Sequence, residues 1–174
     1  GDEEPDGPEI VLVLPAHTSG WLEQATMEMR RKQLLQQLVN KDVNGRLLVV
    51  APVSDELGDE TINVHSKVMI VDDRWLRIGS SNLSCRSLGL DSECDIVVED
   101  PEGDVAAELR ADLIAEHVGA RVDEVRALID EHGIAGALSN LGDGGRRLER
   151  VTIAPAEYAE ALEPLAKIAD MEKP

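Results

Sequence analysis

A short segment in the middle of the chain carries two groups of charged and polar residues at fixed spacing. His65, Lys67 and Asp72 spell His-x-Lys-x4-Asp, and residues 79–82 spell Gly-Ser-x-Asn. If positions were independent, a chain of this composition would contain the first motif in about one case in a hundred, and both motifs at this offset in about one in a million. The pattern therefore indicates a functional site.

The first motif brings an imidazole and an ammonium group together. Residues two apart on a strand point to the same face, so we expect His65 and Lys67 to project together and Ser66 to point away. The ammonium group suits an anionic oxygen, and Ser80 and Asn82 add uncharged donors, which is the equipment for holding a tetrahedral phosphate. Imidazole is a competent nucleophile near neutral pH. The residues predict phosphodiester cleavage through a phosphohistidine, with no metal or other cofactor required.

A β-hairpin must position these groups. Residues 64–71 are mostly β-branched and apolar, Asp72 and Asp73 supply turn chemistry, and residues 75–78 return as a second strand before Gly79. The first arm of the hairpin would carry both members of the imidazole and ammonium pair.

The flanking sequence alternates between strand and helix patterns, which predicts layers of helices on a sheet. Pro52 is expected to stop the strand that precedes it. The expected strands are 10–14, 47–50 and 95–98, and the expected helices are 20–38, 103–118, 122–132 and 155–169, with a loop at 139–147. We divide the chain into a disordered acidic tail (1–9), a catalytic half-domain (10–133) and a C-terminal extension of loop plus helix (134–174).

Composition limits the function. The chain has 174 residues, of which 35 are acidic and 17 basic, and its formal net charge of −18 repels polyanions. Aromatic residues make up 2%, with no Phe, so the core must be aliphatic and no platform for stacking single-stranded bases is expected. Nucleic acid is therefore a disfavoured partner.

The same survey bears on location. No stretch approaches the roughly 20 apolar residues of a membrane span, and no secretory signal opens the chain. Cys85 and Cys94 alone are no disulfide framework, which favours a reducing compartment. The basic cluster at residues 30–32 could touch an anionic membrane, although a solvated helix face explains it better. We expect a cytoplasmic protein, with peripheral membrane contact left open.

The two motifs resemble those that define the phospholipase D superfamily. Residues 86–87 and 89–93 look like the segment that follows this motif in the C-terminal half of bacterial two-motif phospholipases D. Residues 21–23 and 113–119 are also similar to bacterial members. The resemblance covers about residues 10–120 and implies a phospholipase D-like α/β/α layered fold with a mixed central sheet.

The resemblance also implies a role for each site residue. His65 would be the catalytic histidine of its half, and Lys67 and Asn82 would grip phosphate oxygens, with Ser80 as a weaker contact of the same kind. Glu93 lies where family members place a carboxylate that accepts a hydrogen bond from the other nitrogen of the histidine. Asp72 completes the catalytic motif, but its position beside the turn favours a structural contact over contact with substrate.

The chain holds only half of such a site. An in-line displacement at phosphorus places the nucleophile and the leaving oxygen on opposite sides, so a second group must face the first across the phosphate. His17, His117 and His132 occur in no second motif. The partner is either a missing N-terminal half or a second copy of the chain. The chain starts without Met and stops just after a helix-like run, which favours a fragment. In an intact two-motif parent, His65 would be the proton donor.

We therefore expect an enzyme of the phospholipase D type that acts on phospholipid, with water or an alcohol as acceptor, and so performs hydrolysis or phosphatidyl transfer. As an isolated half, the chain is expected to be inactive. Two other interpretations stay open. One is a homodimeric single-motif endonuclease, which the negative charge disfavours. The other is a catalytically silent scaffold module that keeps the pocket for binding phosphate.

Overall fold

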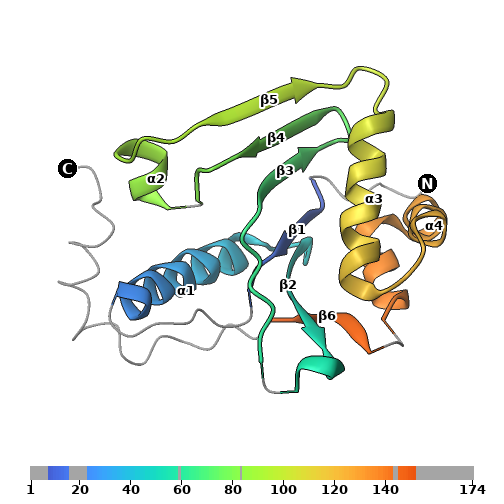
Figure 1. Ribbon diagram of the computed structural model, residues 1–174, viewed down its shortest axis with the longest axis horizontal. Helices are drawn as coiled ribbons and strands as arrows, with labels where there is room; N and C mark the ends of the chain where they lie inside the picture. Colours follow the sequence, from blue (N-terminus) through green and yellow to red (C-terminus); the bar gives the residue numbers. More distant parts are fainter. Residues whose placement is uncertain (1–7, 16–22, 59, 83, 143–144, 152–174) are drawn as a thin grey trace. The chain divides into compact units, whose positions relative to one another are not determined.

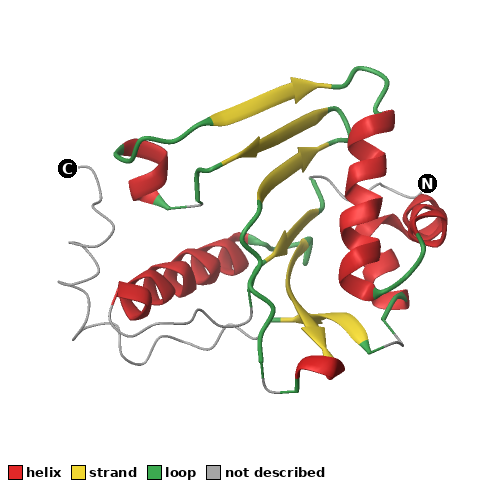
Figure 2. Ribbon diagram, in the orientation of Figure 1, coloured by secondary structure: helices red, strands yellow, loops and turns green. Residues whose placement is uncertain are grey.

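The computed structural model describes residues 8–15, 23–58, 60–82, 84–142 and 145–151 (Figure 1). Helices and strands are interspersed along the chain (Figure 2), so the fold is α/β, as the sequence predicts. The chain divides into two compact units, and each is described by itself. The first comprises residues 1–17, 36–64 and 111–152, and the second comprises residues 18–35, 65–110 and 153–174.

The predicted strands and helices are present, with shifted boundaries. The helix expected at 155–169 lies outside the described residues. The strands are β1 (Ile10–Val13), β2 (Leu47–Ser54), β3 (Lys67–Val71), β4 (Trp75–Gly79), β5 (Asp95–Glu99) and β6 (Arg146–Arg150). The helices are α1 (Glu23–Lys41), α2 (Cys85–Gly89), α3 (Asp104–Val118) and α4 (Val122–Asn140), with a short 3₁₀ turn at Asp55–Leu57.

The first unit is built on the three-stranded sheet β1-β2-β6. β1 runs parallel to β2, with Ile10 opposite Leu47. β6 runs antiparallel to β2, so this sheet is mixed, as expected. β2 is the central strand, and its residues 48–52 are buried, in keeping with the continuous apolar run that predicted a buried strand.

Aliphatic side chains join this sheet to α3 and α4. Leu48 and Val50 lie two apart on β2 and so point to the same face, where they enter a buried cluster. The helical members of the cluster are Ala111, Ile114, Ala115 and Val118 of α3, and Val125, Ile129, Ala137 and Leu138 of α4. The core is therefore built from Leu, Val, Ile and Ala, as the absence of Phe requires.

Pro52 does not stop the second strand, contrary to expectation, but lies buried inside it. The hydrogen bond from Val151 N to Val49 O (2.9 Å) sets the antiparallel ladder, and in this register the nitrogen of Pro52 points away from β6. On that other side, β1 pairs with β2 only as far as Val50. The parallel ladder ends with the bond from Leu14 N to Val50 O (2.9 Å), because the next bond would need an N–H at residue 52. Pro52 therefore ends the pairing with β1 and leaves the pairing with β6 intact.

Residues 134–151 belong to the first unit, although the sequence analysis placed them in a C-terminal extension with a loop at 139–147. α4 continues through a break at Gly133, where φ is 71°, and its second segment joins the core. The carboxylate of Glu9 accepts hydrogen bonds from the two backbone N–H groups that follow the break (3.0 and 3.1 Å). Glu9 thus caps a helix segment, where the sequence predicted a disordered tail.

The second unit contains the antiparallel sheet β3-β4-β5, with β4 in the centre. All five residues of β5 are exposed. A loop connects β5 to α3, and the carboxylate of Asp100 accepts hydrogen bonds from the backbone N–H groups of Val105 (2.9 Å) and Ala106 (3.0 Å). These bonds satisfy orphan donors in the first turn of α3 and fix where the helix begins.

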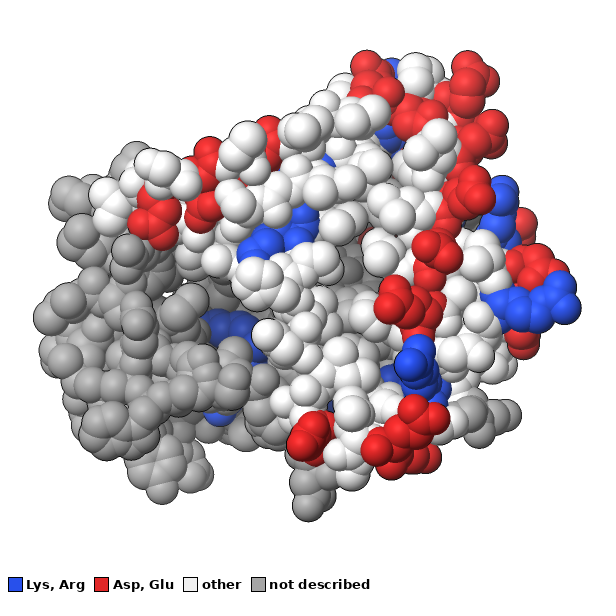
Figure 3. All heavy atoms as spheres, in the orientation of Figure 1, with Lys and Arg blue, Asp and Glu red and all other residues white. Residues whose placement is uncertain are grey.

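α3 presents a stripe of acidic side chains to solvent. Asp104, Glu108, Asp112 and Glu116 recur every four residues, and all four are exposed. They lie on one face of the helix and form the red band that follows α3 in Figure 3. Part of the negative charge that the composition gives the chain is gathered on this helix face.

Candidate functional site

Two aspartates close the hairpin that carries the first motif. β3 and β4 pair antiparallel, with Val71 opposite Trp75. Asp72 and Asp73 both have positive φ (53° and 52°), which a type I′ turn requires and which aspartate tolerates. The Arg110 guanidinium donates to the carboxylate of Asp73 at 2.7 Å and so ties the turn to α3. The predicted hairpin and its turn chemistry are confirmed.

Asp72 lies far from the other members of its motif. It follows the last residue of β3, whereas Lys67 is the first. Five residues of strand separate them by about 16 Å, at about 3.3 Å per residue. One phosphate cannot contact both side chains. The structure therefore assigns Asp72 to the turn and does not bring it into the cluster that the motif predicted as catalytic.

His65 and Lys67 do lie together. Nζ of Lys67 is 3.2 Å from Nε2 of His65 and 2.7 Å from the carbonyl oxygen of His65. An ammonium group can only donate, so Nε2 is the acceptor in this contact. His65 precedes β3 and is not part of it, so the lysine side chain reaches back along the chain to make the contact.

Strand pairing places the second motif beside the first. Lys67 is opposite Gly79 across the β3–β4 pair, and Gly79 is opposite Asp95 across the β4–β5 pair. A Cβ atom at Gly79 would lie 1.7 Å from Oδ1 and 2.8 Å from Cα of Asp95, closer than any real Cβ contact. Only glycine fits at this position of β4, between Lys67 of β3 and Asp95 of β5, which explains the glycine of Gly-Ser-x-Asn. We call this position the glycine crossing, or Gly79 crossing.

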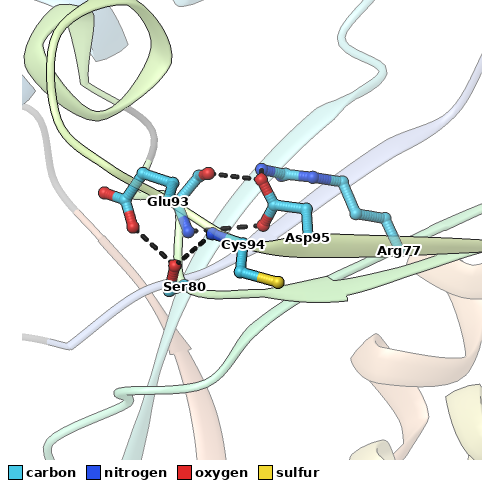
Figure 4. Close-up of polar contacts among 6 residues, drawn as sticks. Arg77, Ser80, Glu93, Cys94 and Asp95 are labelled. Atoms are coloured by element: carbon cyan, nitrogen blue, oxygen red, sulfur yellow. Dashed lines mark hydrogen bonds and ion pairs between the residues drawn. The ribbon is translucent and has the colours of Figure 1, made fainter.

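Ser80 is held by both the backbone and a carboxylate (Figure 4). Its N–H donates to the carbonyl oxygen of Cys94 (3.1 Å), and its Oγ accepts from the Cys94 N–H (3.0 Å). The same Oγ donates to Oε2 of Glu93 at 2.5 Å. Within the described part of the chain, the hydrogen bond of the Glu93 carboxylate goes to Ser80 and not to the ring of His65. The predicted histidine-orienting contact is therefore not the one formed here.

Asp95 binds the next residue of the turn, a contact that the sequence analysis missed. Its Oδ2 accepts hydrogen bonds from Ser81 Oγ and from Nη2 of Arg77 (3.0 Å), and its Oδ1 accepts from Ser81 N (3.3 Å). The hydrogen bond from the Ser81 hydroxyl, and secondarily the Arg77 guanidinium, hold the pKa of Asp95 below its ordinary value. The carboxylate is therefore charged at neutral pH.

Asn82 is exposed and lies just before α2. Its carbonyl oxygen accepts from Ser84 N (2.9 Å), and Oγ of Ser84 accepts from Ser87 N (3.2 Å) as a cap for α2. The loop geometry is thus fixed by its neighbours, and the Asn82 side chain faces solvent.

The hairpin and its neighbouring strand define a class of protein. The imidazole and ammonium pair of His65 and Lys67 lies beside Gly79, which leads directly into the turn that carries Ser80, Ser81 and Asn82. The class is an α/β domain whose His-x-Lys-x4-Asp and Gly-Ser-x-Asn segments lie side by side in one sheet.

The comparison with protein families agrees with this class. The sequence model of the family described as "Cardiolipin synthase, PLD-like domain" matches residues 4–116, well over half of the chain. The chain therefore belongs to the phospholipase D superfamily, as its motifs predicted.

Curated relatives are phospholipases D of plants, fungi and other eukaryotes. The chain is 40% identical over 84 residues to phospholipase D zeta 1 of Arabidopsis thaliana, covering 40% of the chain and 8% of that protein. It is 39% identical over 101 residues to phospholipase D zeta 2 of the same plant, with 49% and 9% covered, and 38% identical over 87 residues to phospholipase D1 of Saccharomyces cerevisiae, with 41% and 5% covered. The chain thus spans less than a tenth of these relatives. The specific likeness to bacterial enzymes stays a prediction.

Proposed function

We propose that this chain supplies one of two half-sites for cleaving a phosphodiester bond of phospholipids, with water or an alcohol as acceptor. The observation that carries the proposal is the pair of His65 and Lys67 beside the Gly79 crossing, in a chain of the phospholipase D superfamily. The names of the relatives support phospholipid hydrolysis, and the name of the family model supports transfer of a phosphatidyl group to an alcohol.

The proposed reaction has two steps. In the first, a histidine nitrogen attacks phosphorus, a P–N bond forms, and the P–O bond to the head group breaks while the leaving oxygen takes a proton from the histidine opposite. In the second, water or an alcohol attacks phosphorus, gives its proton to that opposite histidine, and the P–N bond breaks. The products are the free head group and a phosphatidic acid or a new phosphodiester.

In a parent with two motifs, we assign His65 to the proton-transferring role. Lys67 would move from Nε2 of His65 to a phosphate oxygen when substrate enters, which leaves Nε2 free to hold the proton that the leaving oxygen needs. Asn82 would add a donor to the remaining phosphate oxygens, whereas the Ser80 hydroxyl, whose one proton goes to Glu93, would first have to leave that carboxylate.

The second half-site must come from outside this chain. His117 lies in α3 and His132 in α4, and neither belongs to a second motif. The partner is the other half of a two-motif parent or a second copy of this chain. Analytical ultracentrifugation separates the two, because a homodimer has twice the chain mass of 18.9 kDa.

Phospholipid is favoured over nucleic acid by charge. The net charge of −18 and the acidic stripe on α3 oppose a DNA backbone, which demands compensating cations. No helix within the described ranges is long and apolar enough to cross a membrane. We place the protein in the cytoplasm, where it would meet its substrate by peripheral contact with a membrane.

The test uses the protein with both half-sites present and offers two substrates at equal phosphate concentration. We expect head-group release from phosphatidylcholine vesicles, and a phosphatidyl-enzyme trapped by acid quench with labelled lipid. Cleavage of plasmid DNA without cleavage of lipid would overturn the proposal in favour of the endonuclease. Cleavage of neither substrate, with inorganic phosphate still bound, would overturn it in favour of the silent module.

A further inference from the structure

Beside the residues proposed to bind phosphate, the carboxylate of Asp95 lies over Gly79, where β3, β4 and β5 run side by side. Lys67, Gly79 and Asp95 are direct cross-strand neighbours on β3, β4 and β5, so their side-chain positions share one face of the sheet. Since neighbouring strands lie about 4.8 Å apart, Asp95 is about 10 Å from Lys67 in backbone position. Gly79, between them, has no side chain.

The carboxylate of Asp95 uses the space that glycine leaves. A Cβ at Gly79 would overlap Oδ1 of Asp95, so the aspartate lies across β4 and reaches the residues beyond the strand end. There it accepts from both the backbone N–H and the hydroxyl of Ser81, which is only 5% exposed. Ser81 is therefore fixed by main chain and side chain together.

Successive residues of the turn are thus hydrogen-bonded to successive residues at and just before the start of β5. Ser80 is hydrogen-bonded to Glu93 and Cys94 (Figure 4). Ser81 is hydrogen-bonded to Asp95. The next residue, Asn82, is exposed and ready to face a ligand. The anchored serines leave the turn little freedom to shift along the sheet.

Arg77 offsets the negative charge of Asp95, so that a phosphate can bind nearby. It lies two residues before Gly79, and its Nη2 donates to Asp95 at 3.0 Å, with both side chains about one quarter exposed. An unpaired carboxylate about 10 Å from Lys67 would repel a bound phosphate. Because Arg77 offsets the charge, Asp95 can hold the turn without opposing the substrate.

We propose that Asp95 is a positioning residue that fixes the turn of residues 80–82, through Ser81, in the place where Asn82 meets the phosphate held by Lys67. This inference rests on the proposed function. Asp95 touches neither substrate nor the reacting atoms and acts through the turn. A displacement of about 1 Å in such a group lowers turnover by about 100-fold.

The test compares variants of the protein that contains both half-sites. We expect Asp95→Ala to lower kcat for phosphatidylcholine by about 100-fold, beyond any change explained by the folded fraction. Asp95→Asn keeps one carbonyl oxygen for Ser81 but sets an amide NH₂ against a donor, so it should recover part of the loss. Ser81→Ala should lower kcat in the same way, and the double variant Ser81→Ala/Asp95→Ala should be no worse than Asp95→Ala alone.

Glu99→Ala is the matched control. Glu99 ends the same strand on the same face and pairs with Arg74 (2.5 Å), as Asp95 pairs with Arg77. We expect kcat within about twofold of wild type, because this pair borders no phosphate donor and exposed pairs contribute little. A second readout is the affinity for inorganic phosphate, followed through the backbone amide signals of residues 80–82. We expect Asp95→Ala to weaken this affinity by about tenfold or more.

The outcomes separate the inference from the proposed function. If the wild-type protein is active and Asp95→Ala has the same kcat and the same affinity for inorganic phosphate, the positioning role alone is overturned. Equal losses in Asp95→Ala and Glu99→Ala would also overturn it, since a general effect of charge on the strand would then be the cause. A wild-type protein that neither cleaves phosphatidylcholine nor binds inorganic phosphate overturns the proposed function and the inference with it.

Discussion

Nζ of Lys67 donates to two acceptors of His65, the ring nitrogen Nε2 at 3.2 Å and the carbonyl oxygen at 2.7 Å. His65 thus accepts from the ammonium group that the proposed function assigns to a phosphate oxygen. When an anion enters, its oxygens compete for the same ammonium group. Under the proposed function, the binding of a phosphate would therefore free Nε2 of His65 for proton transfer.

Replacing the ammonium group tests this coupling. Lys67→Met keeps the length of the side chain but removes the charge, and we expect kcat/KM for phosphatidylcholine to fall by about 100-fold to 1000-fold, the usual cost of losing one donor to a developing anion. Steady-state kinetics on vesicles measure it. Lys41→Met, at the exposed end of α1, is the control and should keep wild-type kinetics. A Lys67→Met protein with wild-type kcat/KM would remove the lysine from the site.

The glycine crossing makes a prediction about stability and activity together. Gly79→Ala forces a Cβ against Oδ1 and Cα of Asp95, so strands β4 and β5 must shift. Overpacking of this kind costs about 1 to 3 kcal/mol, and we expect a lower melting temperature and a loss of turnover in the folded fraction. Gly145→Ala is the control, since its Cβ would meet nothing closer than Asp55 Cβ at 3.9 Å. Equal melting temperatures for the two variants would contradict the crowding argument.

The capping contact of Glu9 predicts a local effect on the first unit. Its carboxylate accepts from Ile134 N (3.0 Å) and Ala135 N (3.1 Å) at the break in α4. Glu9→Ala leaves those donors to water, and we expect a loss of about 1 kcal/mol in the free energy of unfolding, the typical cost of a lost cap. Glu9→Gln retains one acceptor and should lose less. Chemical denaturation measures both, and an unchanged Glu9→Ala protein would rule out the cap.

His117 gives the pH dependence of stability a defined sign. Its partial burial in α3 lowers the pKa of the imidazole below the ordinary value of about 6.5, and the charge of Glu116 offsets this only in part. As pH falls below about 6.5, the unfolded chain binds a proton that the folded chain refuses, so the stability present at higher pH is lost.

Melting temperature as a function of pH measures this effect. Between about pH 7.5 and 5, the wild-type protein should lose stability, and His117→Gln should lose less of it. Asp42 and Asp95, whose pKa values are lowered by backbone hydrogen bonds from Leu47 and Arg46 and by the Ser81 hydroxyl respectively, contribute only at more acidic pH, near and below 4. Parallel curves for wild type and His117→Gln would refute the assignment.

The hairpin could be predicted from sequence because its signals are local. Asp72 and Asp73 supply turn chemistry between two apolar runs. The spacing of the two motifs indicates that Lys67 and Gly79 belong to the same site. Strand pairing then places the last two opposite each other without further information.

Tertiary contacts explain what the sequence analysis missed. Pro52 is a strong local signal for the end of a strand, but β2 continues through it while it pairs with β6. Gly133 is a similar signal for the end of a helix, but α4 resumes after it, where Glu9, more than 120 residues away in sequence, accepts a hydrogen bond from Ile134 N. The partner of Glu93 and the role of Asp95 depend on which strand lies beside which, and in what register. A glycine that ends a strand, followed by an aspartate that opens the next, is the only sequence signal for that crossing.

The most direct test of the central claim is head-group release from phosphatidylcholine vesicles by His65→Ala, in the protein with both half-sites. Loss of a positioned proton-transfer group lowers rates by about 100-fold to 10,000-fold, and we expect a fall in kcat of that size with an unchanged melting temperature. His132→Ala, at an exposed histidine of α4, should keep wild-type turnover. Head-group release by His65→Ala at the wild-type rate would contradict the account.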